Sequence, residues 1–338
     1  MLHTDVCLEA LAYELPPYVV SSESIFERLS PMLSRLKIPV ESIQVTSGVE
    51  EIRFWDEGDT IVSTATRAAR KAIEKSGIDL GDIGLIVSTS VSKDYIEPSM
   101  ASLVHGELGL PETCKNFDVG SACLGFFNGV SIVADYISMG RIKAALIVDS
   151  ESSREIVEST INSLLKPETT VADFQVNFAA LTLGSGAVAV VITHRSVSKS
   201  PHMIRGHVTL ADTVHRHLCL GNRTEMLVQS RQLYEAGLAV YRRTWELSKE
   251  IFEWDVDTID MFICHQVAAR HHQGLFDQIG VPPEKTFATF PFLGNAGPAS
   301  VPLTTALALD AGKIKSGDRL CWLGIGSGLN CSIMDLVW

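Results

Sequence analysis

The chain alternates long amphipathic segments with short, nearly continuous apolar runs. Apolar residues recur every three or four positions, the spacing of one helix face, over residues 21–36, 60–76, 98–109, 124–139, 227–252 and 301–309. Apolar runs of strand length, typical of strands buried in a sheet, cover residues 6–15, 83–90, 144–149, 178–192, 259–264, 320–323 and 331–337. This alternation predicts an α/β protein.

One stretch interrupts the pattern. Residues 150–177 are polar, helical in parts and broken at Pro167. We expect this stretch to form a cap that is inserted over the core.

The chain also shows weak internal similarity. Residues 79–90 are similar to residues 255–266, and residues 140–148 are similar to residues 312–323. The two segments follow the same order in each half of the chain. A repeated order predicts two similar halves, which we place at residues 1–195 and 196–338. No linker rich in Pro, Gly and Ser separates them, so we expect them to pack as one body.

Cys123 lies where a short strand-compatible segment, residues 116–119, turns into an apolar helix. A thiol there feels the helix dipole and the N–H groups of the first turn, which favour the thiolate. The same N–H groups would hold the oxyanion that forms when the sulfur attacks a thioester. A small buried core residue is the other interpretation, because free cysteine is often buried.

Two polar residues stand at the ends of predicted elements. His265 ends the strand over residues 259–264, and α/β sheets place functional groups at such ends. A histidine that is merely hydrogen-bonded there fits equally well. Asn295 lies in a turn of small residues, GNAGPAS; its amide could donate to a substrate carbonyl, or it could be a plain turn residue.

The glycine-rich loop GIGSG, residues 324–328, superficially suggests a nucleotide site. It leads into a strand, whereas a dinucleotide fingerprint leads into a helix, so we reject that interpretation. We expect the backbone N–H of Ser327 to reach the thiol site instead.

Glu97 precedes a predicted helix start, where the helix dipole stabilises a carboxylate. Service as a base would need partial burial to raise its pKa. Four other histidines, His215, His217, His271 and His272, lack the spacing of metal ligands. We expect them to have surface or packing roles.

Composition narrows the function classes. With 28 basic and 40 acidic residues the formal charge is −12, which argues against sequence-independent binding to nucleic acid. The seven cysteines are scattered and form no CxxC pair, so we expect neither a disulfide framework nor a metal site. We see no signal peptide and no apolar run long enough to span a bilayer, and we predict a cytoplasmic protein.

Taken together, these motifs resemble the thiolase superfamily, and in particular ketoacyl-acyl-carrier-protein synthase III and its relatives. They occur in the same order over essentially the whole chain, as SACLGF at Cys123, CHQVA at His265, GNAGPAS at Asn295 and the closing GIGSG loop. The resemblance implies a thiolase fold, with five layers α-β-α-β-α and two pseudo-repeated halves. The first half would carry the nucleophile Cys123, the second His265 and Asn295, and the protein would be a homodimer.

Within the superfamily the chain most resembles OleA-type enzymes, which join two fatty acyl-CoA molecules head to head at the start of bacterial long-chain olefin biosynthesis. The segment VSKDYIEPS places Glu97 where synthase III enzymes carry phenylalanine, and LGIGSGLNCS also looks OleA-like. An enzyme that decarboxylates malonyl gains its carbanion by losing CO2. An enzyme that condenses without decarboxylation must remove an α-proton and needs a positioned carboxylate.

The resemblance therefore implies an acyltransferase that uses CoA thioesters and no further cofactor. Cys123 would take the first acyl group, and the N–H groups of Cys123 and Ser327 would hold the oxyanion. His265 and Asn295 would hold the thioester oxygen of a second acyl-CoA, and Glu97 of the partner subunit would take its α-proton. Downstream enzymes of olefin biosynthesis are further partners that the resemblance implies.

Three alternatives stay open on the sequence. The first is a decarboxylating β-ketoacyl-ACP synthase III that uses malonyl-ACP. The second, hydroxymethylglutaryl-CoA synthase, fits the motifs less well, and the third is a catalytically silent subunit that only shapes a partner's tunnel.

Neither the alkyl-chain tunnels nor the CoA contacts can be read from the residues. We expect the tunnels to be lined by the cap and the helix after Pro98. Four basic side chains could bind the phosphates of CoA, namely Arg53, Lys93, Arg205 and Arg243. Each of them could equally be a solvated surface charge.

Overall fold

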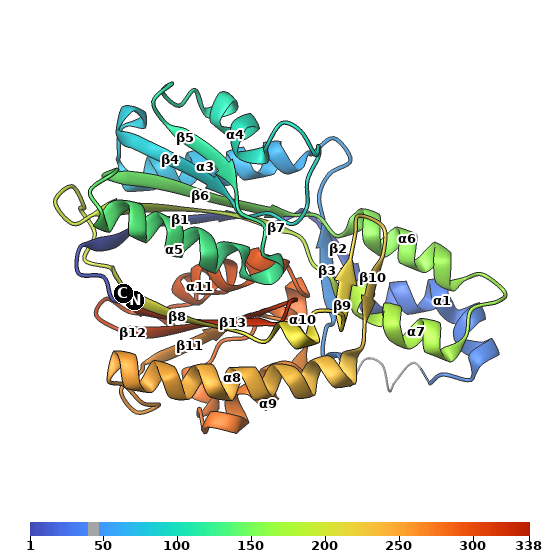
Figure 1. The fold of residues 1–338 in the computed structure, drawn as a ribbon. Coiled ribbons are helices and arrows are strands. Elements are labelled where there is room, and N and C mark those ends of the chain that lie inside the picture. Colours follow the sequence, from blue (N-terminus) through green and yellow to red (C-terminus); the bar gives the residue numbers. More distant parts are fainter. Residues whose placement is uncertain (40–46) are drawn as a thin grey trace.

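The computed structural model describes residues 1–39 and 47–338. Figure 1 shows helices and sheets stacked in alternating layers: α3 and α4, one sheet, α5 and α11, a second sheet, then α8 and α9. This is the α-β-α-β-α order of the thiolase fold, which confirms the predicted fold class.

The first sheet layer contains the strands of the N-terminal part. They are β1 (Val6–Glu14), β4 (Ile83–Ser88), β5 (Lys115–Asp118), β6 (Ala144–Glu151) and β7 (Gly186–His194). Strand β1 pairs antiparallel with β7 and β7 antiparallel with β6, whereas β6, β4 and β5 run parallel. Most of β6 and β7 is buried, as their unbroken apolar sequence predicts for strands covered on both faces.

The second sheet layer repeats this plan. Its strands are β8 (Met203–Ala211), β11 (Met261–Cys264), β12 (Arg319–Gly326) and β13 (Asn330–Val337). Strand β8 pairs antiparallel with β13 and β13 antiparallel with β12, whereas β12 and β11 are parallel. The two layers are connected at one point, because Cys7 of β1 pairs with Met203 of β8. Through this pair the strands form one continuous sheet in the order β11-β12-β13-β8-β1-β7-β6-β4-β5.

The weak internal similarity falls on equivalent strands. Its first pair of segments contains β4 and β11, and its second pair contains β6 and β12. Strand β4 lies parallel to β6 just as β11 lies parallel to β12, so the two halves are structural repeats. The division at residue 195, in the connection between β7 and β8, stays a prediction.

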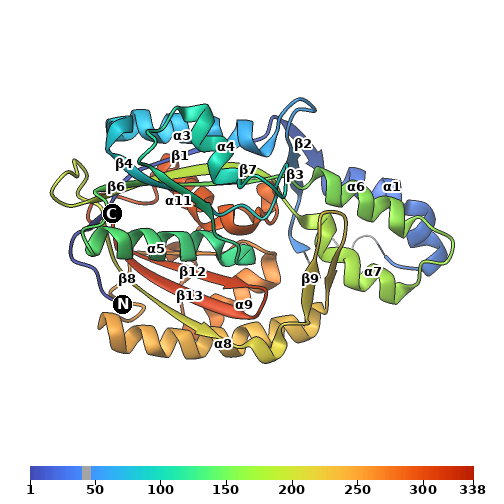
Figure 2. The same ribbon diagram turned by 45° about the horizontal axis from the view of Figure 1, so that its top comes forward.

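The layer position of each helix explains its composition. The middle helices are α5 (Gly125–Ser138) and α11 (Ser300–Asp310), and both lie between the sheets in Figure 2. Sheets cover them on both sides, and α11 is accordingly buried nearly all round. The outer helices are amphipathic because one face meets water, and they are α3 (Ile61–Ser76), α4 (Met100–Leu108), α8 (Ser230–Phe252) and α9 (Ala269–Ile279).

A smaller unit projects from one side of the layers (Figures 1 and 2). It comprises α1 (Ser22–Leu36), α6 (Arg154–Leu164), α7 (Val171–Asn177), β2 (Tyr18–Ser21), β3 (Glu51–Phe54), β9 (Cys219–Gly221), β10 (Met226–Val228) and the short α10 (Phe290–Leu293). Helices α1, α6 and α7 share an apolar core that includes Phe26, Ile161 and Phe174. Helices α6 and α7 make up most of the stretch predicted as a cap, although Ser150 and Glu151 still belong to β6.

Several predicted boundaries are wrong. The helix predicted from residue 227 begins at Ser230, because Leu227 and Val228 belong to β10. The helix predicted from Pro98 begins at Met100, because Ser99 is its N-cap and accepts the Ser102 N–H at 3.1 Å. The strand predicted from residue 178 begins at Gly186, and Phe178–Thr182 is a helical turn instead. Among the described residues, no helix is both long enough and apolar enough to cross a bilayer.

Phe126 tests the packing of the middle layer. It is fully buried on α5, with its ring centroid 5.7 Å from that of Trp322 on β12. We expect Phe126→Ala to lower the free energy of unfolding by about 3–5 kcal/mol, because it leaves a cavity between the sheets. Met139→Ala, at a residue that is 69% exposed, should change it by less than about 0.5 kcal/mol. Urea unfolding followed by circular dichroism would measure both, and equal effects would contradict this account of the layer.

Candidate active site

Cys123 lies on a single helical turn, Ala122–Leu124, directly before α5. Ala122 has a φ of 45°, a left-handed conformation that costs a non-glycine residue free energy and clusters at functional sites. Gly125 permits the turn, because a Cβ there would lie 2.5 Å from the carbonyl oxygen of Thr89, just after β4. The predicted strand, turn and helix around Cys123 are therefore present.

The thiol does not favour the thiolate in the resting protein, so that expectation is wrong. Burial raises the pKa of Cys123 to about 12, and the nearby Cys219 and Glu151 also raise it. Desolvation penalises the charged form, and at this site it outweighs the helix dipole and the local N–H groups. The sulfur is therefore a neutral thiol at pH 7.

His265 follows β11 and is 6% exposed. Its backbone N–H donates to the carbonyl of Leu323 at 2.7 Å, which extends the pairing of β11 with β12. Burial lowers the pKa of His265 to about 4, and His271 also lowers it. The imidazole is therefore neutral above about pH 5 and offers one N–H donor.

Asn295 is held at both its backbone and its side chain. Its N–H donates to Thr182 at 2.9 Å, and its carbonyl accepts from Gly184 at 2.8 Å. Its side-chain Oδ1 accepts the N–H of Gly297 at 3.0 Å. This bond uses the oxygen end of the amide and leaves Nδ2 as the group that can donate to a ligand.

The end of β12 packs against the Cys123 turn. This strand continues to Gly326, whereas the sequence predicted that it ends at Leu323 and that a loop begins at Gly324. A Cβ on Gly326 would lie 3.2 Å from the backbone N of Leu124 and 3.5 Å from that of Cys123. Gly326 of the GIGSG segment thus allows two backbones to approach each other. Ser327 follows Gly326 and lines the same cavity as Cys123.

One cavity of about 130 Å³ brings four of the predicted residues together, namely Cys123, His265, Asn295 and Ser327. Apolar side chains make up much of the rest of its wall. Helix α8 contributes several of them, including Leu233, Leu238 and the ring of Tyr241. A thiol, a neutral imidazole and an amide donor in the wall of a largely apolar cavity suit a thioester that carries an alkyl chain.

Comparison with known proteins agrees with this geometry. The model of the 3-oxoacyl-[acyl-carrier-protein] synthase III family matches residues 117–209, and that of its C-terminal part matches residues 250–338. The acyl-CoA:acyl-CoA alkyltransferase of Xanthomonas campestris is 38% identical, and that of Shewanella oneidensis is 36% identical, each with full coverage of both chains. The β-ketoacyl-[acyl-carrier-protein] synthase III of Anaplasma marginale is 27% identical over 85% of this chain and 87% of its own.

Solved structures show which members of this family the chain is similar to. The structure of Xanthomonas campestris OleA with bound lauric acid and lauroyl-CoA superposes with a TM-score of 0.97, at 38% identity, and each chain covers the other completely. This chain belongs to the OleA family. It is an acyltransferase of the thiolase superfamily.

Two residues of this OleA-family cavity escaped the sequence analysis. His271, expected in a surface or packing role, lines the cavity, and its ring meets that of Tyr234 edge-on with centroids 5.3 Å apart. Cys219, on β9, also lines it. Only the place of His271, six residues after His265 and in the helix that follows the CHQVA motif, could have suggested the first, and nothing local marks the second.

Glu97 does not line the cavity of its own chain in this OleA-family member. It lies on the exposed loop between β4 and α4, beside Ile96, which is 94% exposed. The described residues therefore give Glu97 no place in the Cys123 cavity of the same chain.

The four proposed CoA contacts also lie outside the cavity, and each is paired with a carboxylate. The pairs are Arg53 with Glu51, Lys93 with Asp118, Arg205 with Asp335 and Arg243 with Asp212. By contrast, the guanidinium of Arg270 stacks over the ring of Tyr234, a cavity residue, at 4.7 Å. No described residue of the cap or of α4 lines this cavity, whereas α8 contributes six of its 22 lining residues. The lining of the alkyl-chain tunnels stays a prediction.

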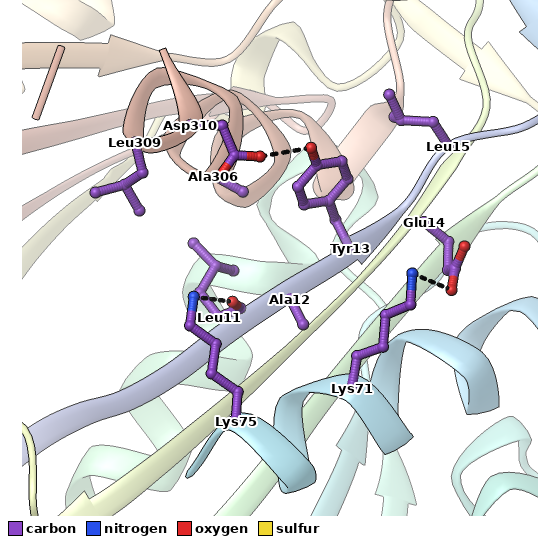
Figure 3. Close-up of a pocket in the computed structure, with 10 residues that line it drawn as sticks. All are labelled: Leu11, Ala12, Tyr13, Glu14, Leu15, Lys71, Lys75, Ala306, Leu309 and Asp310. Carbon is purple, nitrogen blue, oxygen red and sulfur yellow. Dashed lines mark hydrogen bonds and ion pairs between the residues drawn. The ribbon is translucent and has the colours of Figure 1, made fainter. Parts of the chain in front are cut away.

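A larger hollow, of about 470 Å³, lies between β1, α3 and α11 (Figure 3). Its polar groups bond to one another: Lys71 pairs with Glu14 at 2.7 Å and Tyr13 donates to Asp310 at 2.7 Å, while Lys75 donates to the carbonyl of Leu11. It contains none of the predicted site residues, and its internal pairing leaves little charge for a ligand.

The raised pKa of Cys123 gives a reactivity test. Only the thiolate reacts with iodoacetamide, so the alkylation rate at Cys123 should rise about ten-fold per pH unit from pH 7 to pH 10, whereas an ordinary thiol levels off near its pKa of about 8.5. Peptide mass spectrometry would follow the Cys123 peptide, and Cys123→Ala would show the contribution of the other thiols. A rate that levels off below pH 9 would contradict the buried neutral thiol.

Proposed function

We propose that this protein joins two long-chain fatty acyl-CoA molecules by a Claisen condensation without decarboxylation, giving an α-alkyl β-ketoacyl-CoA. The observation that carries the proposal is the full-length identity of 36–38% to named acyl-CoA:acyl-CoA alkyltransferases. The β-ketoacyl synthases III reach 24–27% over 85–90% of the chain. The decarboxylating alternative is therefore the less well supported.

The first step is acyl transfer to Cys123. The sulfur attacks the thioester carbon, the bond to the CoA sulfur breaks, and CoA leaves with the thiol proton. The N–H groups of Cys123 and Ser327 would hold the oxyanion, and loss of one such donor costs roughly 3–4 kcal/mol in barrier. The close packing of Gly326 against Cys123 supports this pairing of donors.

The second step is carbon–carbon bond formation. His265 and Asn295 would donate to the thioester oxygen of a second acyl-CoA, which stabilises the enolate formed when its α-proton leaves. The α-carbon then attacks the acyl-cysteine carbonyl, and the Cys123 sulfur leaves and recovers a proton. A neutral His265 and the free Nδ2 of Asn295 suit this role, because both act as donors without bringing a charge.

Glu97 would take the α-proton in the cavity of a partner subunit. Its exposure on a loop that also exposes Tyr95 and Ile96, at 62% and 94%, supports a homodimer in which this loop is covered. Strand β5 lies at one end of the ladder, and an unpaired edge strand can pair with a second copy.

CoA thioesters would be the substrates, without a further cofactor, and Arg270 at the cavity is our candidate for a CoA phosphate. The cytoplasmic location and the downstream olefin-forming enzymes belong to the same proposal.

The reaction class is tested by its products. Incubation with one pure long-chain acyl-CoA should yield CoA and the self-condensed β-ketoacyl-CoA, identified by mass spectrometry as such, as the β-keto acid that water releases from it by hydrolysis of the thioester, or as the ketone left when that acid loses CO2. The decarboxylating alternative predicts no such product until malonyl-ACP is added.

Two substitutions separate the steps. Cys123→Ala should abolish acylation, whereas Glu97→Gln should still gain one acyl group, seen by intact-protein mass, but lose roughly 10²–10⁴-fold in condensation rate, the contribution of a general base. A Glu97→Gln protein that condenses normally would remove Glu97 from the mechanism.

The subunit arrangement has its own test. Ile96→Asp would bury a charge in the proposed interface, so light scattering should show a shift from dimer to monomer and condensation should fall with it. Leu80→Asp, at an exposed leucine outside this loop, is the matched control and should stay dimeric.

A further inference from the structure

Glu151 is a buried carboxylate that the mechanism above does not use. It is the last residue of β6 and is 6% exposed. It lies close enough to Cys123 to affect the thiol electrostatically. A buried charge of this kind needs a specific set of donors.

The carboxylate of Glu151 holds the start of the Glu97 loop. Its Oε1 accepts the backbone N–H of Val91 at 2.6 Å. Its Oε2 accepts the N–H of Ser92 at 3.0 Å and the hydroxyl of Ser92 at 2.6 Å. Hydrogen bonds to a carboxylate are stronger than those between neutral groups, so this contact fixes two consecutive residues of the loop.

The same carboxylate borders the Asn295 turn. A Cβ on Gly297 would lie 3.7 Å from Cδ of Glu151, and the N–H of Gly297 is the group that holds Oδ1 of Asn295. Glu151 thus lies between the turn that aims the Asn295 amide and the loop that carries Glu97.

The neighbouring Asp149 ionises less readily than Glu151. Asp149 is fully buried, accepts from the Thr89 hydroxyl and lies beside the Glu151 carboxyl group. Burial and the charge of Glu151 raise the pKa of Asp149 well above its usual range. Burial also raises the pKa of Glu151, to about 7, but the donors from Val91 and Ser92 lower it and so favour its charged form.

The rest of the loop is tied down on either side of Glu97. Lys93 pairs with Asp118 at 2.6 Å, and Asp118 also accepts the N–H of Ala101 at 2.9 Å. Asp94 accepts the first N–H groups of α3, from Ile61 and Val62, each at 3.0 Å. Glu97 therefore stands on a short exposed segment whose ends are fixed.

We propose that Glu151 is a positioning residue that clamps Val91 and Ser92 and so sets the place of Glu97 for proton abstraction in the partner's cavity. The inference rests on the proposed role of Glu97. It separates two steps that share one cavity, because the clamp serves condensation and has no part in the acylation of Cys123.

The test is Glu151→Gln, compared with Glu155→Gln, which makes the same change at an exposed residue of α6. A glutamine places an NH2 against an N–H donor on one side, so one arm of the clamp opens. We expect condensation to fall roughly 100-fold, the scale set by a displacement of about 1 Å. The burst of CoA from acylation should be undiminished, because the change also removes a charge that opposes the Cys123 thiolate.

An isotope effect distinguishes misplacement of Glu97 from simple damage to the fold. With acyl-CoA deuterated at the α-carbon, the deuterium effect on condensation should increase in Glu151→Gln, because proton removal becomes more rate-limiting. A smaller fraction of folded enzyme would lower the burst and the condensation together and leave the isotope effect unchanged, and that result would overturn the proposal. So would a normal condensation rate in a folded variant.

Two further variants keep the outcome decisive. Ser92→Ala removes the hydroxyl arm, together with the bond that this hydroxyl accepts from the Ser152 N–H at 3.1 Å. It should give the same pattern with a loss of about ten-fold, even if Glu151→Gln does not fold. Glu97→Gln is measured beside them. If it condenses normally, the proposed role of Glu97 as the base fails and the present inference fails with it; if it loses condensation while Glu151→Gln and Ser92→Ala do not, only the present inference fails.

Discussion

The contact between the Cys123 turn and the end of β12 joins the nucleophile of the first half to the glycine-rich segment of the second. A Cβ on Gly324 would lie 2.5 Å from Cδ2 of Leu124 and 2.6 Å from Cε2 of Phe127. Any side chain there would push the second sheet away from α5. The proposed oxyanion donors of Cys123 and Ser327 come from different halves, so their spacing depends on how tightly α5 is held between the two sheets.

The same packing sets the electrostatics of the cavity. Burial raises the pKa of Cys123 and lowers that of His265, so the thiol and the imidazole are both neutral at rest. In the proposed mechanism, negative charge then develops only when the thioester is attacked. It develops on the thioester oxygen, which the N–H groups of Cys123 and Ser327 would hold. Donors that are already in place need no reorganisation at that moment, which is the main source of their effect on rate.

Sequence alone predicted the elements that carry their own periodicity. Helices over residues 21–36 and 60–76 and the strands at β4 and β6 match the structure closely, because apolar spacing reflects burial directly. The order of the motifs also predicted that Cys123, His265, Asn295 and Ser327 share one cavity. His271, Cys219 and Glu151 were missed because their importance comes from which elements meet in space. The ionisation of Cys123 was misjudged for the same reason, since desolvation depends on all the surrounding layers and the helix dipole only on α5.

In the proposed mechanism the exposed Glu97 serves a partner subunit, so the two half-reactions draw on residues of different subunits. Cys123, His265, Asn295 and Ser327 belong to one chain and suffice, in the proposed mechanism, for acyl transfer and for holding the second thioester. A permanent carboxylate inside that apolar cavity would be destabilised by desolvation. It would also raise the pKa of the Cys123 thiol, as the buried Glu151 already does. A base brought in from a partner on an anchored loop avoids placing a second charge beside the sulfur within one chain. Condensation would then require the assembled dimer, whereas acylation would not.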